Sequence, residues 1–245
     1  MDAKKTDHKQ FLITYISYIL LIIATLTVAI LSYIYIQSQW TYLIIFSLLF
    51  LLVVLSYRFK KRLYLIIHQS YLTNIRADVI EPLELTSAVD MIYIQRRLLK
   101  EGFKLHYTDQ QYVVLTKIEK DDLIRKVFQH HILYVAVLLF HEQSSFYQEK
   151  VDQLINQIQY DSQTQDKKRI DRLLITQYKP IKTFNDKAKD AINEIIFIKT
   201  DRHIVSTINV GLVESPKLAL MLMSKTYQPS SYYDLHRKLI LTSLQ

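Results

Sequence analysis

The longest uncharged stretch of the chain constrains its fold more than any other feature. From Phe11 to Tyr57 there is no Asp, Glu, Lys, Arg or His, and Leu, Ile, Val, Phe and Tyr dominate. A helix that spans a bilayer needs about 20 predominantly apolar residues, so this stretch is long enough for two spans. Its one polar cluster lies at residues 37–39. The pattern therefore predicts a transmembrane hairpin with helices over residues 11–36 and 40–57.

A buried core hairpin and a cleaved signal peptide are the alternatives for this stretch. A helix in a globular core seldom has more than about 14 uninterrupted apolar residues. Residues 11–36 are longer than the apolar region of a signal peptide, no convincing cleavage site follows them, and a second apolar segment comes immediately after. The sequence favours two membrane helices over both alternatives.

The basic residues at the two ends of the hairpin predict its orientation. Lys4, Lys5 and Lys9 precede the first helix, and the connection between the helices carries no Lys or Arg. Because Lys and Arg accumulate on the cytoplasmic side, we expect a two-pass protein of the cell membrane with both termini in the cytoplasm. Four basic residues that follow the second helix are expected to contact anionic lipid headgroups: Arg58, Lys60, Lys61 and Arg62.

The net charge of +8 is unevenly distributed. Residues 1–10 contribute +1, residues 58–62 contribute +4, and residues 63–245 contribute only +3. Half of the excess thus belongs to the membrane edge, and the rest of the chain is nearly balanced. A nucleic-acid partner is therefore not expected.

The composition also removes several enzyme classes. The chain has two glycines, so it contains no GxGxxG dinucleotide loop, Walker A loop or GxSxG nucleophile elbow. It has no cysteine, which excludes a thiolate nucleophile, a disulfide and any metal site built on cysteine. We expect neither a cofactor nor a metal ion.

Charge and hydropathy divide the chain into four parts. Residues 1–10 are a cytoplasmic tail, residues 11–57 the transmembrane hairpin, and residues 58–85 a basic stalk and linker. Apolar residues at spacings of three and four predict that the second helix continues as an amphipathic stalk to about Arg76. Residues 86–245 are expected to form one cytoplasmic domain, since that length suffices for a single core.

Hydropathy periods and capping signals predict an α/β domain with a mixed sheet. Helices are expected from Ser87 to Gly102, over residues 145–160, after Asn185, after Ser215-Pro216 and over residues 231–243. Residues 161–168 are expected to form a loop. Strands are expected over residues 103–107, 112–118, 123–129, 132–140, 172–177, 194–200 and 203–210.

Two pairs of polar residues bracket the predicted central strand. His130 and His131 precede it, and His141 and Glu142 follow it. A strand of this length extends for about 30 Å, so the two pairs lie too far apart to share a metal ion. His141 and Glu142 are candidate catalytic residues, but the second histidine of a zinc-protease motif is absent.

A further candidate pair lies at a predicted hairpin turn. Asp201 and His203 flank this turn and could orient each other as an acid–base pair. The more ordinary interpretation of this pair, and of the residues around the central strand, is that they are polar residues of strand ends and turns.

The order of helix, glycine, hairpin, further strands, helix and strand resembles the core of restriction-endonuclease-like nucleases. In that family a carboxylate on the second strand and an E-x-K or D-x-K motif on the third bind metal. Here Asp109 lies before the second strand of the hairpin, and Glu119 and Lys120 are adjacent. The resemblance covers about ninety residues and is an analogy of topology alone, without the metal-binding motif.

These observations predict an integral membrane protein whose cytoplasmic α/β domain acts by binding a protein partner or another copy of itself. The alternative is a membrane-tethered hydrolase or nuclease-like enzyme with a degenerate active site. That alternative would need acidic residues that converge on one edge of the sheet, and no such convergence is visible in the sequence.

Overall fold

A computed structural model of the chain describes residues 2–35, 40–76, 82–85, 90–123, 130–166, 168–183, 185–200, 203–224 and 226–245. The chain divides into two compact units, Met1–Thr73 and Asn74–Gln245.

The first unit is a helical hairpin. Helices α1 (Asp2–Tyr35) and α2 (Trp40–Arg76) are each long and apolar enough to cross a membrane. The hydroxyl of Tyr18 on α1 donates a hydrogen bond of 3.0 Å to Oγ of Ser56 on α2, and its ring lies 5.2 Å from that of Phe59. Only 6% of the most apolar window of each helix is buried, whereas the core helix of a soluble protein is mostly buried. The continuous α2 confirms the predicted extension to Arg76.

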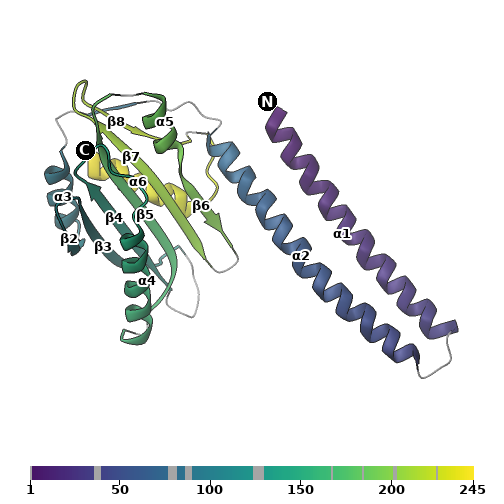
Figure 1. Ribbon diagram of the computed structural model, residues 1–245. Coiled ribbons are helices and arrows are strands. Elements are labelled where there is room, and N and C mark those ends of the chain that lie inside the picture. The colour runs from purple at the N-terminus through teal and green to yellow at the C-terminus, as the bar shows by residue number, and fades with distance from the viewer. Residues whose placement is uncertain are drawn as a thin grey trace. The chain divides into compact units, whose positions relative to one another are not determined.

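The second unit contains a mixed sheet of eight strands flanked by helices, which confirms the predicted α/β class (Figure 1). The strand order is β1-β8-β7-β5-β4-β3-β2, with β6 paired to β7 off this path. Strands β4, β5 and β7 are mutually parallel, and the other pairings are antiparallel. The strands are β1 (Leu83–Glu84), β2 (Lys104–Thr108), β3 (Tyr112–Lys120), β4 (His130–Leu139), β5 (Arg169–Ile181), β6 (Ile196–Lys199), β7 (Ile204–Val213) and β8 (Leu218–Met221).

Strands β6 and β8 share one edge of β7. Strand β5 pairs with β7 along its whole length, from Ile204 to Val213. On the other edge, β6 pairs with residues 204–207 and β8 with residues 210–213. Strand β7 is therefore hydrogen-bonded on both sides at both of its ends.

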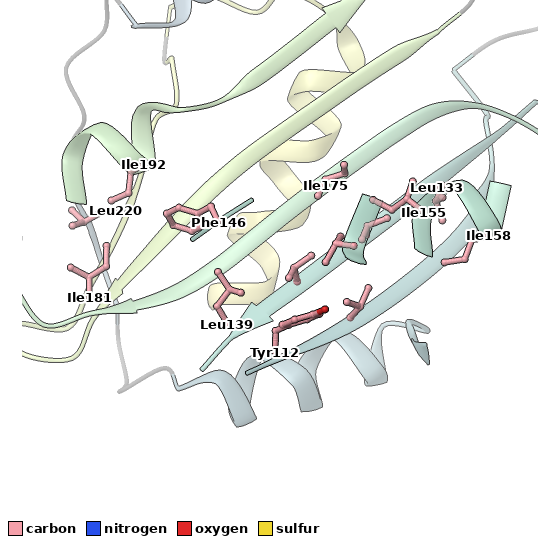
Figure 2. Close-up of a cluster of buried hydrophobic side chains, with 14 of the residues drawn as sticks. Tyr112, Leu133, Leu139, Phe146, Ile155, Ile158, Ile175, Ile181, Ile192 and Leu220 are labelled. Carbon is pink, nitrogen blue, oxygen red and sulfur yellow. The ribbon is translucent and has the colours of Figure 1, made fainter. Parts of the chain in front are cut away.

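Two helices cover each face of the sheet. Helices α4 (Glu149–Thr164) and α5 (Asp186–Asn193) lie on one face and pack on a buried apolar cluster. Helices α3 (Met91–Lys100) and α6 (Ser231–Leu244) lie on the other face, with α4 in front of the strands and α6 behind them in Figure 1. Figure 2 shows the cluster on the α4 face, which includes Tyr112, Leu133, Leu139, Phe146, Ile155, Ile158, Ile175, Ile181, Ile192 and Leu220.

Polar side chains fix the helix starts. Asp90, Asn185 and Ser230 each accept a hydrogen bond from a backbone N–H in the first turn of the helix that follows. These contacts satisfy donors that have no partner within the helix. Gly102 has φ 89° directly after α3, a left-handed conformation that glycine adopts without a steric penalty. The predicted caps at Asn185 and Gly102 are thereby confirmed.

Several predicted elements differ from the structure. The helix predicted after Ser215-Pro216 is wrong, because residues 214–217 form a turn with a cis Ser215-Pro216 peptide and the next residues pair with β7 as β8. The loop predicted at residues 161–168 is wrong over its first half, where α4 continues to Thr164 and buries Ser162. The strand predicted over residues 123–129 falls almost wholly outside the described residues. The helix start predicted at Ser87 is wrong, because the backbone of Asp90 is extended and Asp90 itself is the N-cap of α3.

Candidate functional site

The α4 helix and strand β6 form the two walls of an open groove, here called the α4–β6 groove. Its volume is about 630 Å³. Its floor consists of side chains of β5 and β7 that point to the α4 face, namely Leu173, Ile175, Val205 and Thr207. The groove exists because α4 packs over β5, while α5 has only eight residues and covers the far end of β7.

Apolar side chains of β6 are exposed along one wall. Ile196 and Ile198 are 46% and 42% exposed, and both line the groove. The intervening Phe197 points to the other face, where it is buried against Tyr233 with ring centroids 6.0 Å apart. Because alternate residues of a strand face opposite sides, burying Phe197 directs both isoleucines into the groove.

One end of the groove is polar. Nδ2 of Asn209 donates to the carbonyl oxygens of Ala191 and Glu194, at 2.8 and 3.0 Å, and so holds the last turn of α5. Oδ1 of Asn209 is buried and has no hydrogen-bond partner among the described residues. Arg76 also lines this end, and its Nη2 donates to the carbonyl of Asn193 at 3.2 Å.

A second concentration of polar groups, the Asp171 cluster, lies where β4, β5 and β7 begin. Oδ2 of Asp171 is 2.5 Å from Nδ1 of His130 and 3.0 Å from Nε of Arg169. Nδ1 of His203 is 3.9 Å from Oδ1 of the same carboxylate. Burial disfavours ionisation of Asp171, but hydrogen bonds from Arg169 and His130 outweigh it and lower the pKa of this carboxyl group.

The Asp171 cluster has one component of a general-base site. A carboxylate on Nδ1 of a histidine fixes the orientation of the ring, as in hydrolases that use His–Asp pairs. However, Arg169 occupies the same carboxylate and adds positive charge beside it. Within the part of the chain that the structure describes, no three His, Asp or Glu side chains are arranged to hold a metal ion.

Next to this cluster, a buried network ties α6 to the sheet. The hydroxyl of Tyr232 donates to Oδ2 of Asp121 at 2.6 Å, and the guanidinium of Arg172 lies 5.1 Å from the centre of the Tyr232 ring. Burial, with the hydrogen bond to Asp121, raises the pKa of Tyr232 to about 12. These groups are enclosed, so their role is structural.

Among the predicted catalytic candidates that the structure describes, His203 lies far from His141 and Glu142, at the opposite end of the parallel strands. His141 is exposed beyond the end of β4 that lies opposite His130. Oε1 of Glu142 accepts a hydrogen bond from the backbone N–H of Lys182 at 2.9 Å, which holds two loops together. His203 is 61% exposed beside Asp171, and Asp201 lies outside the described residues.

The remaining predicted residues have separate surroundings. The four basic residues proposed to contact lipid headgroups are all exposed on α2: Arg58, Lys60, Lys61 and Arg62. Asp109 precedes β3, whereas Glu119 and Lys120 end it and Glu119 pairs with Lys117 at 2.7 Å. The acidic positions suggested by the nuclease analogy thus lie at opposite ends of one strand.

No local signal in the sequence indicates the Asp171 cluster. His130 and His131 mark a strand end, but Asp171 is 41 positions away from His130 in the chain. The contact between Asp171 and His130 depends on the parallel register of β4 and β5 and on the irregularity between His131 and Ile132. Neither feature follows from residue spacing.

No protein-family model, curated protein or solved structure matches this chain.

Proposed function

We propose that the protein is a membrane-anchored interaction module. Two helices hold it in the cell membrane with both termini in the cytoplasm, and its α/β domain binds a protein partner or another copy in the α4–β6 groove. The observation that carries the proposal is the groove itself, with Leu173, Ile175 and Val205 in its floor and two isoleucines of β6 more than 40% exposed. Exposed apolar surface of this kind, rimmed by polar side chains, is typical of interaction sites.

The hairpin supports the anchoring part of the proposal. Large apolar side chains such as Leu20 and Phe46 are 60% and 73% exposed along helices without charged residues between Phe11 and Tyr57. In water this surface would be unfavourable, and in a bilayer it is solvated by lipid. Tethering in two dimensions raises the effective concentration of neighbouring partners, so a groove with modest affinity suffices.

Cysteine labelling tests the orientation, because the chain has no native cysteine. A Ser38→Cys variant should react with an impermeant maleimide added outside intact cells. A Gln163→Cys variant, changed at an exposed position of α4, should react only after lysis. Labelling of the Gln163→Cys variant in intact cells would overturn the orientation.

Site-specific cross-linking tests the groove. A photoreactive phenylalanine analogue at Ile198 in the full-length protein in membranes should yield a discrete adduct. Leu99 is the matched control, because it is also 42% exposed but lies on α3 at the other face of the sheet. An adduct of twice the mass of the chain would identify self-association, and another mass would identify a partner. Equal yields at both positions, or no adduct at either, would contradict the proposal.

One observation favours a second function, the membrane-tethered hydrolase. Asp171 contacts Nδ1 of His130, so Nε2 of His130 is the ring nitrogen that could accept a proton from a nucleophile. If this function is correct, the full-length protein should hydrolyse members of a chromogenic ester and phosphodiester panel, and His130→Gln should abolish that activity. Absence of turnover by the wild type, or full activity in the His130→Gln variant, would rule out the hydrolase function.

A further inference from the structure

The α4–β6 groove lies in the layer of helices that covers one face of the sheet. Helices α4 and α5 form this layer over the buried apolar cluster (Figure 1). With 16 residues α4 is about 24 Å long, whereas α5 has eight residues and extends for about 12 Å. Strand β7 has ten residues and extends for about 33 Å. Helix α5 therefore covers only part of β7, and the groove is the uncovered remainder of the helix layer.

The α4 wall of the groove has the spacing of a helix–helix contact. Its lining residues recur at intervals of three and four, and they are Gln148 at the N-cap and then Val151, Asp152, Ile155, Asn156 and Gln159. This stripe covers about three turns and is about 16 Å long. Residues at these spacings lie on one side of a helix, and two packed helices have their axes about 8–10 Å apart. The wall therefore matches a second helix that lies beside α4.

The apolar surface of the groove is accessible to such a helix. Ile196 and Ile198 on the β6 wall are both more than 40% exposed, and Leu173 and Val205 in the floor are half-buried. Residues that face the same side of a strand are about 6.6 Å apart, close to the rise of about 6 Å between positions i and i+4 of a helix. Apolar side chains at helical spacing can therefore contact both isoleucines at once.

The charges around the groove favour a basic helix. Asp152 on α4 and Glu194, the C-cap of α5, are exposed and line the groove. The C-terminal end of α5 adds a partial negative charge beside Glu194. Arg76 is the one basic side chain of the described lining, and it donates to the carbonyl of Asn193 at this helix end. The lining therefore carries more negative than positive charge.

We propose that the groove binds an amphipathic, basic helix of a partner protein. Its apolar stripe packs on the floor of the groove and on the two isoleucines of β6. Basic residues beside that stripe pair with Asp152 and Glu194. This inference rests on the proposed function, because it names the kind of segment that the groove receives. Apolar grooves recognise amphipathic helices through side chains at positions i, i+3, i+4 and i+7.

Fluorescence anisotropy with the full-length protein in nanodiscs of zwitterionic lipid tests this inference. The probe is a fluorescein-labelled peptide of leucine, alanine and lysine, about 14 residues long, with its leucines at spacings of three and four. It should bind the wild type after the signal of empty nanodiscs is subtracted. A peptide of the same composition with leucines at alternate positions, the pattern of a strand, should bind at least about tenfold more weakly. Replacement of every lysine by glutamate should weaken binding by about fivefold.

Variants of the groove have matched controls on the same chain. Ile196→Ser should weaken binding of the lysine peptide with helical leucine spacing by about fivefold. Ile92→Ser, at a position that is 54% exposed on α3, should leave this binding unchanged. Asp152→Asn should weaken it by about threefold. Glu149→Gln is the control for that change, because both acids lie in the first turn of α4 and Asp152 is the one in the described lining of the groove.

The outcomes separate this inference from the proposed function. Equal binding of the two leucine patterns, or unchanged affinity in both Ile196→Ser and Asp152→Asn, would overturn the inference. Cross-linking from Ile198 reports on the proposed function separately. An adduct with another protein, without binding of the peptide, would keep the groove as an interaction site and contradict the helix. An adduct of twice the mass of the chain would place a second copy in the groove and contradict the partner helix. Absence of both the adduct and peptide binding would contradict the proposed function as well.

Discussion

The surroundings of His236 on the α6 face and the groove on the α4 face differ in how their polar groups are satisfied. On the α6 face, the ring of His236 is fully buried between the hydroxyls of Thr176 and Ser206, with both nitrogens at 2.9 Å from a hydroxyl oxygen. On the α4 face, the groove leaves Ile198 exposed and Oδ1 of Asn209 unpaired among the described residues. A buried network in which every polar group is hydrogen-bonded stabilises one packing arrangement of the core. An open face with exposed apolar side chains and an unpaired polar atom can gain contacts when another molecule binds there. We therefore expect the α6 face to serve stability and the α4 face to serve binding.

The largest expected effect is the loss of His236. In His236→Leu, the hydroxyls of Thr176 and Ser206 lose a buried partner, and the free energy of unfolding should fall by about 2–5 kcal/mol. Denaturant unfolding of the full-length protein in detergent, followed by the signal of the α/β domain, measures this loss. A decrease in the free energy of unfolding below about 0.5 kcal/mol, within the range of ordinary surface substitutions, would contradict the expected role of the α6 face in stability.

The same residue predicts a pH dependence. Burial lowers the pKa of His236 to about 3, from 6.5 in the unfolded chain, so below pH 6.5 the unfolded state binds the proton that the folded state excludes. Stability should therefore decrease as the pH falls from 6.5 towards 3, by about 2 kcal/mol between pH 7 and pH 5. His236→Gln should lack this part of the pH dependence. An unchanged pH profile in His236→Gln would show that another group is responsible.

A smaller effect is expected from a second contact on the α6 face. The buried hydroxyl of Tyr178 donates to Oγ of Ser243 at 2.6 Å, because the Ser243 hydroxyl donates its own hydrogen to the carbonyl of Ile240. Tyr178→Phe should cost about 1 kcal/mol, because Ser243 keeps its other partner. Measurement of the Tyr178→Phe and His236→Leu variants together should give additive losses if the two contacts are independent.

The smallest effect on stability is expected on the open face. Ile198→Ser should change the free energy of unfolding by less than about 0.5 kcal/mol, since 42% of the side chain is already exposed. Its effect should instead appear in cross-linking of the full-length protein. With a photoreactive group at Ile196, the yield of the cross-linked adduct should be lower in the Ile198→Ser variant. A stability loss comparable with that of His236→Leu would show that the groove belongs to the core.

The elements that follow from local patterns could be predicted from the sequence. The uncharged stretch from Phe11 to Tyr57 predicted two helices, and Asn185 and Gly102 marked helix ends where the structure has them. The alternating residues after Gly102 predicted the β2–β3 hairpin. In each case the signal lies within a few residues of the structure it specifies.

The parts that depend on distant pairing could not be predicted in this way. Ser215-Pro216 is compatible with a helix start and with a turn. The turn forms because Leu218–Met221 pairs with β7 as a strand. The Asp171 cluster depends on strands that begin 39 residues apart, at His130 and Arg169, being parallel neighbours. The groove depends on how much of the sheet α5 leaves uncovered, which no residue spacing encodes.

The pairing of β1 with β8 has a consequence for how the protein is made. Leu83 lies opposite Ala219, and the backbone N–H of Leu85 donates to the carbonyl of Lys217 at 3.0 Å. Chains emerge from the ribosome N-terminus first, so the apolar helices are available for insertion long before Ala219 has been synthesised. Until β7 emerges, one edge of β5 has no partner strand and could pair with a neighbouring chain. Folding of the sheet is therefore completed late in synthesis, long after both helices of the N-terminal hairpin have emerged.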